Sequence, residues 1–167
     1  MLELKNVVLK TRHMILNDES FSFENGKIYG VVAVNGSGKT TLFRAITHLI
    51  PLSAGSIEMD SNLSTFYYET SEWFDGYLSG MDYLKFVKNM WKSDHDINKE
   101  IEYWDMGEYI NVPVRKYSLG MKQRLLIAMY FVSRADVMLM DEITSGLDEE
   151  NRKKFFKRID ELDKSNK

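Results

Sequence analysis

Residues 30–43 read GVVAVNGSGKTTLF, and this stretch decides the fold. An apolar run ends at Val34, a loop with Gly36 and Gly38 follows, and apolar residues then recur at helical spacing. Glycines allow the amides of such a loop to converge, and the amino end of the next helix adds its positive dipole end. We therefore expect an α/β fold in which this loop holds the phosphates of a nucleotide.

The residues of the loop have separate expected roles. Lys39 reaches the β- and γ-phosphates as a point charge, and the hydroxyl of Thr40 is a ligand for Mg²⁺. The full pattern G-x-x-x-x-G-K-[ST] has its first glycine where this chain has Ala33. The alternative interpretation is a simple glycine turn that carries a lysine. The residues expected to bind the nucleotide are Asn35, Gly36, Ser37, Gly38, Lys39, Thr40 and Thr41.

Two acids close a second apolar run. Residues 137–140 read VMLM without polar alternation, which is typical of a buried parallel strand. Open α/β folds bind ligands at the carboxyl ends of such strands. We therefore expect Asp141 to hold Mg²⁺ and Glu142 to orient or deprotonate the water that attacks the γ-phosphate. Without the glycine loop, solvated acids at a helix cap would be the simpler interpretation.

The chain as a whole falls into three stretches that differ in residue composition and expected secondary structure. Its beginning is rich in strands, its middle is polar, aromatic and helical, and its end is helical again. Strands are expected at 2–8, 21–23, 28–34, 53–60, 63–68 and 137–140, helices after the glycine loop, within 69–117, at 119–133 and at 149–163.

Composition excludes several classes of protein. The chain has 167 residues, which suits one domain, and its net charge of −3 argues against a nucleic-acid binder. It has no cysteine, so disulfides, thiolate nucleophiles and cysteine metal sites are excluded. The longest apolar run, residues 125–132, is far shorter than the ~20 residues of a membrane helix, and no signal-peptide core stands at the start. A cytoplasmic location is expected.

Two further stretches identify a family. Residues 117–124 read YSLGMKQR and residues 144–148 read TSGLD. They resemble the signature motif and the D-loop of ABC transporter ATP-binding subunits, and the phosphate loop, helical insert, signature, acidic strand and D-loop follow in that family's order. The resemblance implies a P-loop NTPase of the α/β class with a mostly parallel core sheet, an antiparallel N-terminal β part and an inserted helical subdomain. The signature wording is most similar to exporters of drugs, peptides and bacteriocins.

The resemblance also implies an organisation and a mechanism. Residues 1–68 and 119–167 would form the nucleotide-binding core, and residues 69–118 the helical subdomain that docks on a membrane permease. Two such subunits, identical or different, would pack head to tail with ATP and Mg²⁺ between them. Ser118 and Gly120 would then face the γ-phosphate held by the other subunit. Hydrolysis of ATP would drive export through a separate permease, with the subunit at the inner face of the membrane and in contact with it only through the permease.

The sequence departs from the family in several places. Glu69 stands where the family usually has the glutamine of the Q-loop, so it is expected to approach Mg²⁺ and the phosphates as a carboxylate. Residues 10–13 lack the aromatic that typically stacks on adenine, which leaves the preference for ATP over GTP open. Ile143 replaces the proline that commonly follows the catalytic glutamate.

The sequence stops at Lys167, before the family's strand with a switch histidine. The C-terminal strands are therefore expected to be missing and the chain to be a piece of a longer one, which leaves open whether these residues alone hydrolyse ATP. Two other functions compete with the exporter subunit. One is a non-transport ABC ATPase, and the other is a regulatory nucleotide-binding subunit without turnover.

Overall fold

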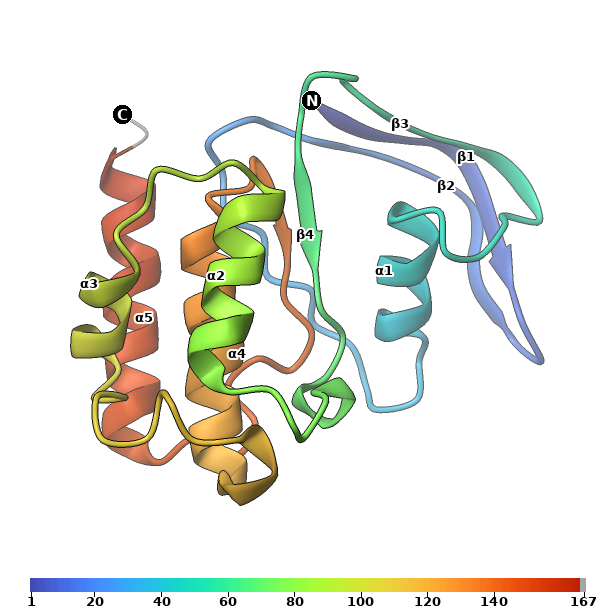
Figure 1. Ribbon diagram of the computed structural model, residues 1–167. Coiled ribbons are helices and arrows are strands. Elements are labelled where there is room, and N and C mark those ends of the chain that lie inside the picture. The colour runs from blue at the N-terminus through green and yellow to red at the C-terminus, as the bar shows by residue number, and fades with distance from the viewer. Residues whose placement is uncertain (166–167) are drawn as a thin grey trace. The chain divides into compact units, whose positions relative to one another are not determined.

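The computed structural model describes residues 1–165 (Figure 1). These residues fall into two units, one made of Met1–Leu63 with the end of α5 from Asp160 onward, the other of Ser64–Ile159. The first unit holds β1 (Leu2–Lys10), β2 (Met14–Phe23), α1 (Lys39–Ile46) and β3 (Ala54–Met59). The second holds β4 (Thr65–Tyr67), η1 (Ser71–Trp73), α2 (Gly80–Met90), α3 (Ile97–Tyr103), η2 (Val114–Lys116), α4 (Leu119–Ser133), β5 (Val137–Leu139) and most of α5 (Glu149–Ser165).

The first unit is an antiparallel sheet in the order β2-β1-β3. The central strand buries Leu2, Leu4, Val7 and Leu9, and the alternation skips one residue because Asn6 has a positive φ of 47° and the register shifts there. Such a bulge moves the side chains that follow it to the other face, so Val7 returns to the core. The expected antiparallel N-terminal part is confirmed.

The expectation of a strand at 28–34 was wrong. The structure has no strand there, and among residues 1–165 no strand is hydrogen-bonded to this run. Its apolar side chains are exposed, with Val32 98% and Val34 78% accessible. An apolar run has the side chains of a buried strand, but a strand also needs neighbours that satisfy its backbone groups, and the described residues supply none.

The second unit is built on a parallel strand pair and a buried helix. Strands β4 and β5 face each other in parallel, with Thr65 opposite Val137 and Tyr67 opposite Leu139. Helix α4 is buried continuously from Leu125 to Ser133, and α2 and α3 both contact it (Figure 1). The helical character of the insert and the helix at 119–133 are therefore confirmed.

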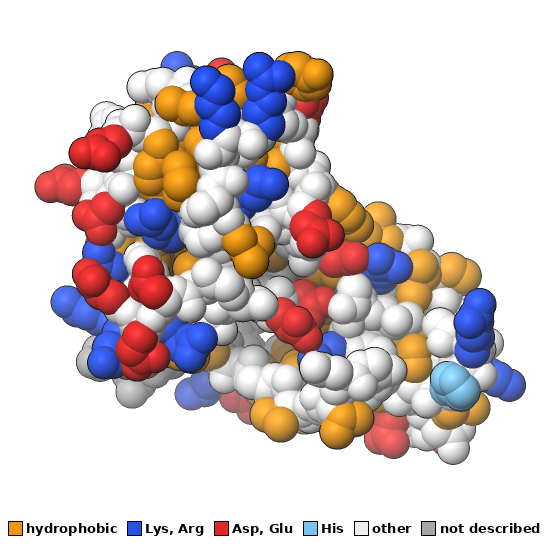
Figure 2. Space-filling model, turned by 90° about the horizontal axis from the view of Figure 1, so that it is seen from below, with side chains coloured by type: hydrophobic (Ala, Val, Ile, Leu, Met, Phe, Trp, Pro, Cys, Tyr) orange, Lys and Arg blue, Asp and Glu red, His pale blue; other side chains and the backbone are white. Residues whose placement is uncertain are grey.

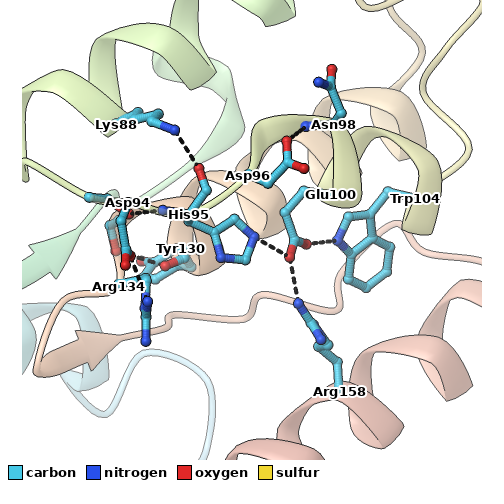
Figure 3. A network of polar contacts seen from close by, with 12 residues as sticks. Lys88, Asp94, His95, Asp96, Asn98, Glu100, Trp104, Tyr130, Arg134 and Arg158 are labelled. Carbon is cyan, nitrogen blue, oxygen red and sulfur yellow. Dashed lines mark hydrogen bonds and ion pairs between the residues drawn. The ribbon is translucent and has the colours of Figure 1, made fainter.

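A buried carboxylate joins α3 to α5 within the second unit. The side chain of Glu100 is fully buried and accepts hydrogen bonds from His95 Nε2 at 2.8 Å, Trp104 Nε1 at 3.1 Å and Arg158 Nη2 at 2.6 Å (Figure 3). Burial alone raises the pKa of Glu100, but the hydrogen bond from His95 and the charge of Arg158 outweigh it, so the pKa lies below its ordinary value. The carboxylate therefore stays charged inside the unit.

Candidate nucleotide-binding site

The glycine loop adopts a conformation that glycine alone accommodates easily. Gly36 has φ +79° and Gly38 has φ +103°, both in the left-handed region. A Cβ built on Gly38 would lie 2.7 Å from Cγ2 of Ile15, on the neighbouring strand β2. Gly38 is therefore fixed by its backbone angle and by the close approach of a side chain.

The loop leads directly into the amino end of α1. Gly38 is the residue before the helix and supplies no side-chain cap, and the first turn carries no acidic residue. The helix therefore offers its first amides and its positive dipole end to an anion. Lys39 Nζ donates to the carbonyl oxygens of Ala33 at 3.1 Å and Val34 at 3.3 Å, so its ammonium group lies over the loop.

The seven residues expected to bind phosphate form one continuous surface element. Asn35 and Gly36 are exposed, and Ser37, Gly38, Lys39, Thr40 and Thr41 are half-buried. Accessible residues before a helix amino terminus suit a phosphate cradle, and phosphate binding by these seven residues stays a prediction. The loop lies in the first unit, and the acidic residues of the candidate site lie in the second.

The parallel pair of β4 and β5 brings two expected acids to one edge. Tyr67 and Leu139 face each other, and Glu69 and Asp141 each come two residues later, beyond the carboxyl ends of the strands. The next residue, Glu142, is exposed and has a positive φ of 43°. A non-glycine residue in this region is held there by its surroundings and is common at functional sites.

Both acids at this edge affect the pKa of a tyrosine in β4. The hydroxyl of Tyr67 donates to Glu69 Oε2 at 3.2 Å. Burial raises the pKa of Tyr67 far above its ordinary value, and the negative charges of Glu69 and Asp141 raise it further. Tyr67 therefore stays neutral and remains a hydrogen-bond donor to the acidic edge.

A second tyrosine hydrogen-bonds to the backbone at the carboxyl ends of both strands. Tyr130, on α4, is fully buried; its hydroxyl donates to the carbonyl oxygen of Leu139 at 2.5 Å and accepts from the backbone N–H of Tyr68 at 3.1 Å. Burial raises the pKa of Tyr130 well above its ordinary value, so the group is a neutral bridge. The carboxyl ends of β4 and β5 are thus fixed by the same side chain.

The acids fit a magnesium ion that a nucleotide brings with it. Carboxylate oxygens are hard ligands, and Mg²⁺ is commonly held by one or two carboxylates together with phosphate oxygens and water. Glu69 and Asp141 provide such a pair, and among residues 1–165 no cluster of three or more His, Cys, Asp or Glu side chains forms a metal site. The donor set therefore suits Mg²⁺ shared with phosphates.

The signature stretch begins α4. Ser118 is the N-cap residue of the helix, and its Oγ accepts from the backbone N–H of Met121 at 3.3 Å. This is the ordinary capping role of a serine that precedes a helix. Ser118 is exposed and Gly120 half-exposed, so both remain accessible at the helix amino terminus.

The D-loop begins α5 in a similar way. Asp148 Oδ1 accepts from the backbone N–H of Asn151 at 2.8 Å and from its Nδ2 at 3.0 Å. These hydrogen bonds from Asn151 hold the pKa of Asp148 below its ordinary value, so the cap is an ionised carboxylate. A negative charge at this position also complements the helix dipole.

Sequence reasoning assigned no role to Gln123 or Tyr130. Gln123 lies within the signature stretch, is 6% exposed, and donates from Nε2 to the carbonyl oxygen of Ile143 at 2.5 Å. The sequence did indicate that both side chains need hydrogen-bond partners, because they are polar groups in a helix that is otherwise mostly apolar and buried. The identity of the partner came only from the structure.

Three comparisons with known proteins bear on the fold and on the family of the chain. A solved structure of an ATP-binding subunit of an ABC transporter superposes with a TM-score of 0.84 at 18% identity, covering 99% of this chain and 75% of that one. The fold is therefore the P-loop fold of ABC transporter ATP-binding subunits. Residues 16–145 match the family model described as ABC transporter, and the chain belongs to that family.

Relatives with described roles are also similar. CtrD, the capsule polysaccharide export ATP-binding protein of Neisseria meningitidis, is 37% identical over 131 residues, which are 77% of this chain and 60% of CtrD. TagH, the teichoic acids export ATP-binding protein of Bacillus cereus, is 32% identical over 160 residues, which are 93% of this chain and 29% of TagH. The chain thus spans well under two thirds of either relative.

Proposed function

We propose that this chain is the nucleotide-binding part of an ATPase that powers export through a membrane permease. The observation that carries the proposal is that Glu69 and Asp141 each follow the carboxyl end of one of two paired parallel strands, in a chain that also holds a phosphate loop. Phosphoryl transfer requires mainly positioning and charge stabilisation, which these groups are suited to provide.

Each group has one role in the proposal. The amides after Gly36 and the ammonium of Lys39 bind the β- and γ-phosphates, and Glu142 orients the attacking water and accepts its proton. Thr40, Asp141 and Glu69 are the residues that would hold Mg²⁺, which supplies charge neutralisation at the phosphates. Glu69 is proposed to act near the metal as a carboxylate, where the family usually has a neutral amide.

The proposal requires a second ATP-binding subunit. Ser118 and Gly120 stand exposed or half-exposed at the amino terminus of α4, a position suited to an anion. In the proposed head-to-tail pair they bind the γ-phosphate held by the other subunit, which is a second copy or a different chain. Closure on ATP and release after hydrolysis then form the switch that drives the permease.

The helical subdomain exposes large apolar side chains, and together they are its proposed docking surface. Four large side chains of the insert are exposed: Trp73 at 55%, Tyr77 at 78%, Phe86 at 58% and Met90 at 62%. Other aromatic side chains of the insert, such as Trp104 and Phe74, are buried and belong to its core. Exposed aromatic and methionine side chains are enriched where proteins associate, so we assign this surface to the permease.

The cellular setting follows from the same argument. No helix within residues 1–165 is long and apolar enough to cross a membrane. Acidic and basic side chains are interspersed on the face in Figure 2 and form no basic patch there, which favours a protein partner over nucleic acid. We place the chain in the cytoplasm at the inner face of the membrane, attached through the permease.

Two classes of compound are candidates for the exported substrate. The signature wording is similar to exporters of drugs, peptides and bacteriocins, whereas CtrD and TagH are named for export of capsule polysaccharide and teichoic acids. We favour a cell-surface polymer, because those similarities extend over 77% and 93% of this chain and the signature only over one stretch.

The catalytic assignment is tested with Glu142→Gln in the full natural assembly. The variant is expected to bind a fluorescent ATP analogue as the wild type does and to lose hydrolysis by at least 100-fold. Glu150→Gln, an exposed acid on α5, is the matched control and should hydrolyse normally. Unchanged hydrolysis by Glu142→Gln would remove Glu142 from catalysis, and no turnover by the wild type would favour the regulatory alternative.

The docking assignment has its own test. Phe86→Asp is expected to release the permease during co-purification while hydrolysis by the free subunit is retained. Phe156→Asp places the same charge at a 54% exposed aromatic on α5 and should leave the complex intact. Equal retention of the permease by both variants would assign docking to another surface.

A further inference from the structure

The side chain of Gln123 reaches from α4 to the segment that follows the acidic strand. Its Nε2 donates to the carbonyl oxygen of Ile143 at 2.5 Å, and both residues are buried, with exposures of 6% and 8%. Ile143 is the residue directly after Glu142. The hydrogen bond therefore holds the peptide unit that joins Ile143 to Thr144, one residue beyond the proposed catalytic carboxylate.

The same segment contacts α4 at a second point. A Cβ built on Gly146, which has φ +79°, would lie 2.9 Å from Cγ and Cδ2 of Leu119. A Cβ on Gly120 would lie 3.4 Å from the carbonyl oxygen of Gly146. The first turn of α4 and residue 146 are thus in close contact, and Gln123 adds a fixed hydrogen bond one turn further along the helix.

The backbone between these two points is a tight, internally bonded turn. The N–H of Ser145 donates to the carbonyl oxygen of Glu142 at 2.8 Å, and that of Leu147 donates to Thr144 at 3.2 Å. Glu142 itself has φ +43°, a conformation that is unfavourable for a non-glycine residue and persists only where contacts offset its cost. The contacts with α4 are the surroundings that the structure provides.

We infer that Gln123 is a positioning residue for Glu142. By holding the carbonyl of Ile143, it fixes the unusual backbone of Glu142 and so directs the carboxylate at the water to be activated. The inference rests on the catalytic role proposed for Glu142. It also means that α4, whose N-cap is Ser118, and the backbone of Glu142 are rigidly coupled. A displacement of either therefore displaces the other.

Two substitutions of Gln123 separate its hydrogen bond from its volume. Gln123→Met keeps the length of the side chain and removes the donor, and Gln123→Glu keeps its shape but, when ionised, has no proton to donate. In the full natural assembly we expect kcat for ATP hydrolysis to fall at least 10-fold with KM within 2-fold of the wild type, because misplacement of a reacting group reduces the chemical step.

The control is Trp104→Phe. It also removes one buried donated hydrogen bond in the same unit, from Nε1 to Glu100, and that hydrogen bond involves none of residues 141–148. If loss of kcat came only from general loosening of the unit, Trp104→Phe and Gln123→Met would lower it equally. Equal losses would overturn the positioning role.

Hydrogen exchange provides a readout that needs no turnover. The amides of Ser145 and Leu147 should exchange at least 10-fold faster in Gln123→Met than in the wild type, and at the wild-type rate in Trp104→Phe. Unchanged exchange at both amides would overturn the inference even if activity fell. Should Gln123→Met not fold, Gln123→Glu carries the same expectations for kcat and for exchange.

Failure of the inference differs from failure of the proposed function. Normal kcat in Gln123→Met beside an inactive Glu142→Gln overturns the positioning role and leaves the catalytic assignment standing. Full turnover by Glu142→Gln overturns the catalytic assignment and the positioning role together, because the carboxylate then has no chemistry to be positioned for.

Discussion

Glu69 and Asp141 occupy equivalent positions, two residues beyond Tyr67 and Leu139, which face each other in parallel strands. The register of β4 and β5 therefore places two carboxylates at one edge, although they are 72 positions apart in the sequence. The raised pKa of Tyr67, caused first by burial and then by the charges of Glu69 and Asp141, is the electrostatic sign of that arrangement. An edge with this charge favours a cation.

Removing one of these acids should weaken the binding of Mg²⁺ during hydrolysis. In Asp141→Asn the Mg²⁺ concentration for half-maximal hydrolysis should rise by about 10-fold or more, as expected when a ligand or its close support is lost. Glu69→Gln should act in the same direction but less strongly, because the amide still offers an oxygen. Glu72→Gln, an exposed acid on η1, serves as control, and a normal Mg²⁺ titration for Asp141→Asn would refute the assignment.

The conformation of the phosphate loop is expected to require glycine at position 38 but not at position 30. Gly38→Ala introduces a Cβ within 2.8 Å of Ile15 at φ +103°, whereas Gly30→Ala meets nothing within 4 Å. The first change should cost about 1–2 kcal/mol in backbone conformation alone and displace the loop amides. We expect the Kd for a fluorescent ATP analogue to rise at least 10-fold in Gly38→Ala.

Gly30→Ala is the matched control for that titration and should bind within 2-fold of the wild type. Both variants change the same residue type in the same stretch, so a difference between them reports on the loop conformation. Equal binding by the two variants would show that the conformation of Gly38 does not matter for the nucleotide.

Much of the site was predictable because its signals are local. The glycine loop and the helix at 119–133 each carry their own pattern of residue types, and the structure confirms both elements. Glu69 was expected near Mg²⁺ because its position resembles that of the family's Q-loop glutamine, and the parallel register of β4 and β5 in the structure places it at the same edge as Asp141. These inferences needed no knowledge of which side chains touch.

The remaining features depend on partners distant in the sequence. Residues 28–34 have the composition of a buried strand, but the structure has no strand there and nothing in the run itself reports whether a neighbour exists. Gln123 and Ile143 are 20 positions apart, and no periodicity predicts their hydrogen bond. The positive φ of Glu142 is likewise imposed by contacts and not by residue type.

The bridge made by Tyr130 should stabilise the carboxyl ends of the strands. Tyr130→Phe removes the hydroxyl and leaves the carbonyl of Leu139 and the N–H of Tyr68 without that partner. The free energy of unfolding, measured by urea denaturation, should fall by about 1–3 kcal/mol. Tyr77→Phe, at a side chain that is 78% exposed, should change it by less than about 0.5 kcal/mol. Equal stabilities would mean that the bridge is energetically neutral.

The buried carboxylate of Glu100 should make the stability of the second unit depend on pH. Its pKa is depressed in the folded protein because the hydrogen bond from His95 and the charge of Arg158 overcome the burial that raises it. Glu100→Gln keeps the shape but leaves Arg158 without its carboxylate, so the free energy of unfolding at pH 7 should fall by about 3 kcal/mol.

The sign of the pH dependence follows from linkage. Since the folded protein holds the pKa below the ordinary value of 4.5, the unfolded chain takes up the proton first as the pH falls. The advantage of the wild type over Glu100→Gln is therefore complete above that value and is lost as the pH falls further toward the folded pKa. Urea denaturation at pH 7 and at successively lower pH checks this, with Glu102→Gln, an exposed acid on the same helix, as control. A stability difference that stayed constant with pH would show that Glu100 contributes through its shape and not its charge.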